Sequence, residues 1–500
     1  MELAAALKDG CSQPARRQNA VALNNGVSMD KKVSWTVSQV LLATNGRFVS
    51  GETETAFRAI STDTRTLKPG DLFVALSGDR FDGQHFLEEA VKKGAAGLVV
   101  SVIPKKKMPV AVVEVPDTLK ALGDLAAYRR RLMGNLLVIA ITGSSGKTTV
   151  KEMCAVILAQ KFAILKTEGN LNNLIGMPLS LLPVENKHDI AILEMGMNRP
   201  GEIARMTAIA NPDIACIVNV QDAHLAGLDS IEGVARAKGE LFERGKSWAR
   251  FCVNIDDKRV KKLAAERSQK QISFGKNRNA DVRATHVRNE GEFGMAFTLH
   301  INHKKERIHI RSLGEHNVTN ALAAAAMSYA AGADFDTIVK GLEKFEPYDK
   351  RLKIEKIAGL RVVNDCYNAN PSSMCAALKT VQAMNKGNKA VAVLGDMLEL
   401  GDSSVKAHRQ LGETVAITGF NSLFVVGEFS RKVVEGALDA RMTINQARQV
   451  NSNDEVIDAL VEMVHLGELN EGDWILVKGS RGMRMETVIE GLKKQLEMES

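Results

Sequence analysis

The residues with the clearest chemical meaning form a short loop after the apolar run Leu136–Thr142. In an α/β fold such a run is a buried strand, and a loop of this kind leads into a helix that opens at Lys147. Backbone N–H groups and a helix N-terminus bind phosphate, and small residues let the backbone approach it closely. The loop consists of Thr142, Gly143, Ser144, Ser145, Gly146, Lys147, Thr148 and Thr149.

This loop predicts nucleoside triphosphate binding. The Lys147 ammonium can reach the β- and γ-phosphates, and the Thr148 hydroxyl can be a ligand of Mg²⁺. The general phosphate-loop pattern has a glycine five positions before Gly146, where this chain has Ile141. The loop alone leaves a kinase, a motor ATPase and a ligase open.

Other polar residues have two interpretations when taken one at a time. Glu194 ends an apolar run, so it either faces a cleft or is a solvated acid. His224 and Lys238 would ordinarily be structural or solvated groups. Asn317 and Asn320 lie three apart at a helix start and share one face, where an asparagine can also be a helix cap.

The predicted elements that position these residues fall into three segments after an N-terminal extension, residues 1–32, that we expect to be poorly ordered. Residues 33–133 should form a small α/β domain with a helix near Phe86–Lys93. Residues 134–346 alternate apolar runs with helices, which predicts a parallel sheet covered on both faces. From 280 to 312 the alternation has a period of two, which predicts an antiparallel extension. Residues 347–500 predict a smaller, Rossmann-like doubly wound domain.

Composition excludes several classes of protein. Apolar residues make up 45% and charged residues 25%, the balance of a globular protein. No apolar run is long enough to span a bilayer, and the N-terminus lacks the pattern of a secretory signal. Six scattered cysteines predict reduced thiols. We therefore expect a cytoplasmic monomer with no membrane insertion, and a net charge of +7 without a basic block argues against nucleic acid.

The loop TGSSGKTT resembles that of the Mur ligase and folylpolyglutamate synthase superfamily. Further stretches resemble the family's other motifs, in the same order and from about residue 55 to the end. They are Ile192–Met197, Asn219–Leu225, Ala235–Leu241, Gly314–Leu322, Tyr348–Leu352 and Asn364–Asn370. Three passages are similar to the family member that adds D-alanyl-D-alanine: Ser61–Phe86, Val393–Gly401 and Val477–Glu486.

The resemblance implies an ATP-dependent ligase that joins D-alanyl-D-alanine to UDP-N-acetylmuramoyl-tripeptide through an acyl phosphate, in peptidoglycan precursor synthesis. It implies one Mg²⁺ held by Thr148 and Glu194. It also implies a second Mg²⁺ site with His224 and with Lys238, which is carbamylated in this family and would then be an anionic ligand. Such a lysine needs a depressed amine pKa.

The resemblance also assigns contacts with the substrates. Asn317 and Asn320 would contact adenine, Asp365 would hold the ribose, and Arg351 would reach the ATP phosphates when the C-terminal domain closes. The UDP-linked substrate would lie on Ser61, Thr62, Asp63, Thr64 and Arg65, near Gly83, Gln84 and His85. Its reacting end would meet Asn170, Asn172 and Asn173, and the dipeptide Asn368 and Asn370.

Three alternatives remain open on the sequence alone. A sibling amide ligase would use another amine or another acceptor. A P-loop ATPase would hydrolyse ATP without an acceptor substrate. A nucleotide-binding module would not catalyse amine-dependent phosphate release.

Overall fold

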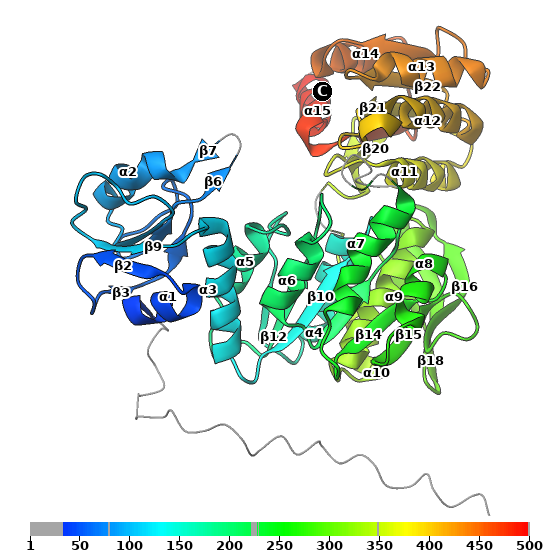
Figure 1. Ribbon diagram of the computed structural model, residues 1–500. Helices are drawn as coiled ribbons and strands as arrows, with labels where there is room; N and C mark the ends of the chain where they lie inside the picture. Colours follow the sequence, from blue (N-terminus) through cyan, green and yellow to red (C-terminus); the bar gives the residue numbers. More distant parts are fainter. Residues whose placement is uncertain (1–33, 79–80, 222–227, 229, 348–349, 499–500) are drawn as a thin grey trace, which may run out of the picture.

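The computed structural model describes residues 34–78, 81–221, 228, 230–347 and 350–498. The extension 1–32 and His224 lie outside the described residues. Three sheets organise the chain into units that we call the N-terminal, central and C-terminal units (Figure 1). Each unit combines a mostly parallel sheet with helices, which confirms the mixed α/β class predicted from the sequence.

The N-terminal unit contains a five-stranded sheet in which the four strands β4, β5, β8 and β9 run parallel and β2 is antiparallel to β9. In spatial order the strands are β2 (Arg47–Ser50), β9 (Ala111–Glu114), β8 (Gly97–Val100), β5 (Leu72–Val74) and β4 (Ile60–Ser61). The helices are α1 (Val37–Thr44), η1 (Gly83–Phe86) and α2 (Leu87–Lys92). The short pairs are β1 (Trp35–Thr36) with β3 (Ala56–Phe57), and β6 (Ser77–Gly78) with β7 (Phe81–Asp82).

The central unit is built on a nine-stranded sheet with β10 near its middle. The order is β11 (Ile164–Lys166), β12 (Ile190–Glu194), β10 (Leu137–Thr142), β13 (Ile214–Ile217), β14 (Arg250–Asn254), β15 (Lys270–Gly275), β16 (Val282–Asn289), β17 (Met295–Ile301) and β18 (Lys304–Ile310). The first seven strands are parallel, and β17 and β18 add the antiparallel extension that the period-two alternation predicts.

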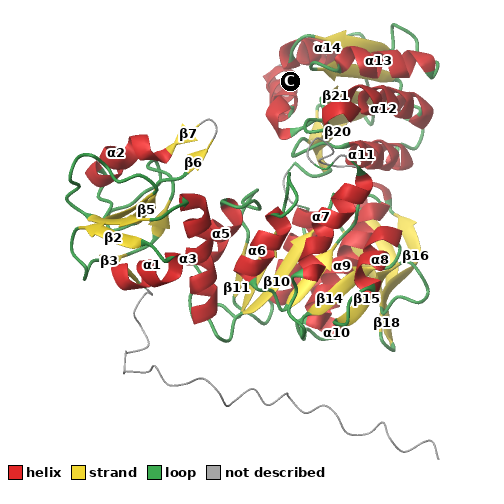
Figure 2. Cartoon of the chain, in the orientation of Figure 1, coloured by secondary structure: helices red, strands yellow, loops and turns green. Residues whose placement is uncertain are grey.

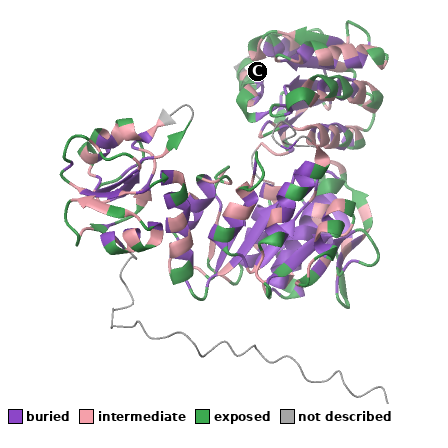
Figure 3. Cartoon of the chain, in the orientation of Figure 1, coloured by how far each residue is buried: buried purple, intermediate pink, exposed green. Residues whose placement is uncertain are grey.

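Helices lie on both sides of this sheet (Figure 2). They are α3 (Thr118–Leu132), α4 (Lys147–Leu158), α5 (Gly176–Leu181), α6 (Glu202–Ala210), α7 (Ile231–Glu243), α8 (Lys258–Ala265), α9 (Glu315–Ala330) and α10 (Phe335–Lys344). Alternate residues of β10 explain why both faces need cover: Val138 and Ala140 belong to one core cluster, and Ile139 and Ile141 to another. The strands β12, β10, β13 and β14 are accordingly buried along most of their length, whereas β11, β16 and β18 are partly exposed (Figure 3).

The C-terminal unit has a six-stranded sheet with helices on both faces. The strand order is β19 (Lys353–Ile357), β20 (Leu360–Asp365), β24 (Trp474–Lys478), β21 (Ala390–Gly395), β22 (Ser422–Val426) and β23 (Ala447–Val450). Only β19 is antiparallel to its neighbour. The helices are α11 (Pro371–Met384), α12 (Ser404–Thr418), α13 (Ser430–Asp439), α14 (Asn453–His465) and α15 (Glu486–Met498), with η4 (Gly401–Ser403) and η5 (Arg481–Met483) between strands and helices.

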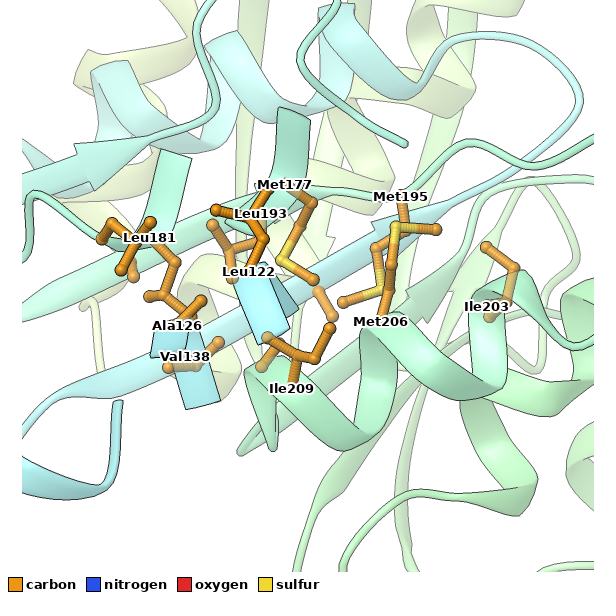
Figure 4. Packing of buried hydrophobic residues seen from close by; sticks show 14 of the residues in the cluster. Leu122, Ala126, Val138, Met177, Leu181, Leu193, Met195, Ile203, Met206 and Ile209 are labelled. Atoms are coloured by element: carbon orange, nitrogen blue, oxygen red, sulfur yellow. The ribbon is translucent and has the colours of Figure 1, made fainter. Parts of the chain in front are cut away.

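The N-terminal and central units share one hydrophobic core. A single cluster of buried side chains extends from Trp35 in β1 to Ala264 in α8. Helix α3 makes this continuity, since it packs against α1 on one side and against α5 and α6 on the other. Figure 4 shows Leu122 and Ala126 of α3 among side chains such as Leu181 and Ile209. None of the described helices is both long and apolar enough to cross a membrane.

Candidate active site

The phosphate loop and Glu194 meet because their strands are neighbours in the parallel sheet. In the β10–β12 register Ile141 pairs with Glu194, so the loop that starts at Thr142 and the Glu194 carboxylate lie at the same carboxyl edge. In open α/β sheets this edge is where ligands bind. A cleft of about 1350 Å³ opens there, and residues of both the central and C-terminal units line it.

The loop turns into α4 at Gly146, whose φ of +79° is a left-handed conformation that suits glycine. A Cβ at this position would lie 2.3 Å from the Asn320 Oδ1, so the side chain of α9 packs directly on the loop. The Lys147 Nζ donates to the Gly143 carbonyl oxygen at 2.7 Å. Burial lowers the pKa of Lys147, and the nearby Glu194 carboxylate opposes that shift. The lysine therefore sits folded over the loop, where a phosphate would compete for it.

Glu194 is held by hydrogen bonds at both carboxylate oxygens. The Thr148 hydroxyl donates to Oε2 and the Asn172 amide donates to Oε1, each at 2.8 Å. The Glu194 backbone N–H also donates to the Thr167 hydroxyl at 3.0 Å. The buried Lys151 fixes that last segment, since its Nζ donates to the Thr167 carbonyl at 2.5 Å. Thr148 and Glu194, which the sequence predicts as partners, are thus brought together.

Arg351 reaches the phosphate loop from the C-terminal unit. Its Nη2 donates to the Thr148 hydroxyl oxygen at 2.9 Å, and its guanidinium lies 4.0 Å from the centroid of the Tyr367 ring. The Thr148 hydroxyl is therefore shared by a carboxylate of one unit and a guanidinium of another. An Arg351 nitrogen therefore lies next to the first turn of the helix that follows the phosphate loop.

Lys238 lies on α7 and is almost completely buried, with 1% of its surface exposed. Burial, and secondarily the charge of Lys147, lower the pKa of Lys238 far below its usual value. Among the described residues no carboxylate forms an ion pair with it, and Lys238 does not line the cleft that these residues enclose. His224, its predicted partner, lies outside the described part of the chain.

The two asparagines of α9, Asn317 and Asn320, lie beside the phosphate loop and are hydrogen-bonded to each other. The Asn320 amide donates to the Asn317 Oδ1 at 2.8 Å, and the Asn317 amide donates to the Leu313 carbonyl at 2.8 Å. Both side chains line the cleft beside the loop. Asp365 lines it from the C-terminal unit, but its carboxylate is paired with the buried Lys478 at 2.6 Å.

Three family models match consecutive parts of the chain. The Mur ligase family catalytic domain matches residues 56–130, the Mur ligase middle domain residues 141–328, and the Mur ligase glutamate ligase domain residues 350–481. The UDP-N-acetylmuramoyl-tripeptide--D-alanyl-D-alanine ligase of Bacillus subtilis (strain 168) is 35% identical over 461 residues, which are 91% of this chain and 98% of that relative. The chain belongs to the Mur ligase family.

Further relatives and solved structures are similar to this Mur ligase over most of its length. The ligase of the same name from Escherichia coli (strain K12) is 36% identical over 92% of this chain and 99% of its own. A crystal structure of MurF from Acinetobacter baumannii superposes with a TM-score of 0.86 at 35% identity, covering 92% of this chain and 99% of that one. A MurF ligase from Thermotoga maritima, solved in complex with ADP, has a TM-score of 0.77 at 27% identity over 88% and 98% of the two chains.

Several predicted site residues of this Mur ligase form hydrogen bonds with backbone groups. Thr142 is fully buried and its hydroxyl donates to the Met195 carbonyl at 2.8 Å, so it joins β10 to β12. Ser144 donates to the Gln221 carbonyl at 2.9 Å. Asn173 accepts from backbone N–H groups at the start of α5, and Asn370 caps α11. Both residues also line the cleft.

The predicted contacts in the N-terminal unit lie apart from the cleft. Ser61 ends β4 and residues 62–65 follow it; the Ser61 hydroxyl donates to the Asp63 carbonyl at 3.1 Å. Asp63 forms an ion pair with the exposed Arg65 at 2.6 Å, which lowers the pKa of the Asp63 carboxyl. Residues 83–86 form η1, and Gln84 lies near Ser101. None of these described residues contributes to the lining of the cleft.

Sequence reasoning missed several cleft residues that this Mur ligase contributes from its C-terminal unit. Tyr367 supports Arg351, and Lys350, Glu399 and Arg481 line the cleft wall. Glu399 and Arg481 belong to the passages Val393–Gly401 and Val477–Glu486, which pointed to the family member but carried no predicted role. A charged residue just after a strand of a doubly wound sheet was the available signal.

Proposed function

We propose that this Mur ligase joins D-alanyl-D-alanine to UDP-N-acetylmuramoyl-tripeptide in the cytoplasm, with ATP as the source of energy. Two relatives, 35% and 36% identical over more than nine-tenths of the chain, are named for this reaction. The observation that carries the proposal is the contact between Arg351 and Thr148, because it joins the C-terminal unit to a phosphate loop in one cleft. A ligase needs such a second unit to bring its amine substrate to the nucleotide.

The chemistry requires two anions to be brought together. A peptide carboxylate oxygen attacks the γ-phosphorus of ATP, ADP leaves, and the product is an acyl phosphate whose leaving group is phosphate. The amine of the dipeptide then attacks, and the tetrahedral intermediate collapses to an amide and phosphate. Lys147, the loop N–H groups and Arg351 supply positive charge for the first step, so catalysis rests on positioning and electrostatics. Acyl phosphates hydrolyse, so closure by the C-terminal unit protects the intermediate.

The described residues suit a hard divalent cation. Thr148 and Glu194 offer a hydroxyl and a carboxylate 2.8 Å apart, and Mg²⁺ prefers such oxygen ligands together with several waters. No group of three His, Cys, Asp or Glu side chains gathers in the described part of the chain, which does not include His224. When bound, Mg²⁺ would neutralise phosphate charge.

We assign a second set of Mg²⁺ ligands to His224 and to a carbamylated Lys238. The neutral Lys238 amine would add to CO₂, forming an N–C bond and releasing one proton, and the product would be an anionic oxygen ligand. Its burial and its lowered pKa support this assignment, because only the neutral amine reacts. A buried ammonium without an anionic partner would also be costly.

We assign the remaining contacts by unit. Residues 134–346 would bind ATP, with Asn317 and Asn320 at the adenine, and Asp365 of the C-terminal unit would hold the ribose. Residues 33–133 would bind the UDP-linked substrate through 61–65, whose reacting end would meet Asn170, Asn172 and Asn173. Residues 347–500 would bind the dipeptide near Asn368 and Asn370. The chain would act as a monomer.

The test is phosphate release by the full chain with Mg²⁺, ATP and UDP-N-acetylmuramoyl-tripeptide, with and without D-alanyl-D-alanine. We expect release only when both substrates are present, and a product heavier by the dipeptide residue in mass spectrometry. Release without any acceptor would indicate a P-loop ATPase and refute the proposal. Release with single amino acids or another UDP-linked acceptor, but not with these substrates, would indicate a sibling ligase.

A further inference from the structure

The C-terminal wall of the cleft carries a cluster with a net positive charge, formed by Lys350, Arg481 and Glu486. Lys350 Nζ and Arg481 Nη1 both lie on the Glu486 Oε1, at 3.1 Å and 2.8 Å. Two cations thus share one carboxylate oxygen. Lys350 and Arg481 line the cleft, whereas Glu486 lies behind them with 12% of its side chain exposed. The cluster therefore presents its cations to the cleft and keeps its anion beneath them.

The other two cations of this wall already have partners. Lys478 is 2% exposed and paired with Asp365. Arg351 donates to Thr148 and belongs with the nucleotide. Arg481, by contrast, has 60% of its side chain exposed, so its remaining N–H donors can meet a ligand. A carboxylate is the natural ligand for a guanidinium that is already fixed on one side.

Glu399 supplies the opposite charge close to this cluster. It has a φ of +65°, a left-handed conformation that a non-glycine residue adopts at a cost and that is often found at functional sites. Its loop is anchored, because the Leu398 N–H donates to the Ser480 hydroxyl at 2.9 Å and the Met397 N–H to His408 at 2.9 Å. Glu399 also lines the cleft.

The hydrogen bond between Leu398 and Ser480 brings Glu399 and Arg481 close together, since these are the next residues of the two segments. Their side chains therefore start from neighbouring backbone positions. An extended dipeptide is roughly 7 Å long from end to end, within the reach of two such side chains. Glu399 and Lys147 both line the cleft, so this carboxylate shares the cavity with the phosphate loop.

We propose that this wall recognises both charged ends of a dipeptide, with Glu399 binding the ammonium and Arg481, supported by Lys350, binding the carboxylate. The amine end then points toward the phosphate loop, where the acyl phosphate forms, and the carboxylate end points away from it. This inference rests on the proposed function. It adds a specificity mechanism, because the separation of Glu399 and Arg481 matches the distance between the two charged ends of a dipeptide. A single amino acid is too short to bind both side chains.

The experiment compares D-alanyl-D-alanine with D-alanyl-D-alaninamide, which lacks the terminal carboxylate, in the full chain at saturating ATP and UDP-N-acetylmuramoyl-tripeptide. We expect the wild type to prefer the free carboxylate by roughly 10- to 100-fold in kcat/KM, the value of a charge-assisted hydrogen bond. In Arg481→Ala that preference should fall to about threefold or less, because KM for the dipeptide rises while KM for ATP stays the same. Glu399→Gln should raise KM for both acceptors by a similar factor.

Arg484→Asn is the matched control, since Arg484 is an exposed arginine at the end of the same short helix and its φ of +51° suits asparagine. This variant should keep the wild-type preference. A full preference for the carboxylate in Arg481→Ala, with ATP binding and Tm unchanged, would overturn the inference and leave the proposed function standing. Equal kcat/KM values of the wild type for the dipeptide and its amide would also overturn the inference and leave the proposed function standing. A wild type that ligates neither acceptor would refute both.

Discussion

Replacing Arg351 with alanine separates its contribution to stability from its proposed contribution to catalysis. The side chain contributes one hydrogen bond to Thr148 and one stacking contact with Tyr367. The stacking contact is worth about 0.5–1 kcal/mol, so Arg351→Ala should hardly change the free energy of unfolding. The functional loss should be much larger, because the variant removes a positive charge from the place where phosphate charge develops.

The size of that loss follows from the contacts. An arginine delivered from a separate element contributes roughly 10³- to 10⁵-fold to phosphoryl transfer, and a single donor to a developing oxyanion roughly 10²- to 10³-fold. Only the Nη2 of Arg351 reaches the loop, and Lys147 remains in the variant. We therefore expect kcat to fall by roughly 10²- to 10³-fold, or about 3–4 kcal/mol in activation free energy.

The assay is coupled phosphate release at saturating concentrations of all three substrates, with Tm measured in parallel. Arg351→Lys is the control, since it keeps the charge but loses the planar donor and the stacked guanidinium. It should recover part of the lost rate. A kcat for Arg351→Ala within threefold of the wild type would show that the arginine does not act on phosphate. A collapse of Tm would show that its contact with Tyr367 is structural.

Three further changes test other parts of the site. Gly146→Ala should abolish ATP binding in calorimetry, because its Cβ would lie 2.3 Å from Asn320 in a left-handed turn, whereas Gly134→Ala, with open space around it, should bind ATP normally. Glu194→Gln should raise the Mg²⁺ concentration needed for half-maximal rate by at least about tenfold, because a hard cation loses an anionic ligand, and an unchanged requirement would exclude a metal role. Wild-type protein in ¹³C-bicarbonate should show a carbamate signal that Lys238→Ala lacks, and the variant should lose activity; equal signals in both proteins would place the carbamate elsewhere.

Periodicity predicts the buried strands of this fold better than its edges. The runs Gly97–Val100 and Ser422–Val426 are mostly apolar and bounded by turns, the pattern that predicts a strand, and they form β8 and β22. The edge strands β19 and β23 were not predicted. β19 contains Lys353, Glu355 and Lys356, and β23 reads Ala-Arg-Gln-Val, since an edge strand needs little apolar surface.

The site divides in a similar way between local and long-range information. A phosphate loop is a property of eight consecutive residues, so its position could be read directly. The pairing of Thr148 with Glu194 depends on the register of β10 and β12, which only the topology provides. The neighbourhood of Glu399 and Arg481 depends on a bond between two loops that are 82 residues apart. Such contacts leave no periodic trace in the sequence.

The shared core of the N-terminal and central units determines which unit can move relative to the others. Because α3 is buried against helices of both units, those two cannot swing past each other without exposing a large apolar surface. The C-terminal unit has core clusters of its own, to which Leu313 is the central unit's contribution. The UDP-linked substrate and ATP would thus bind to two units that move as one body. The dipeptide would bind to the C-terminal unit, which moves relative to them. A cross-link between the N-terminal and central units near α3 should then leave kcat unchanged. A cross-link between the central and C-terminal units across the cleft should abolish turnover.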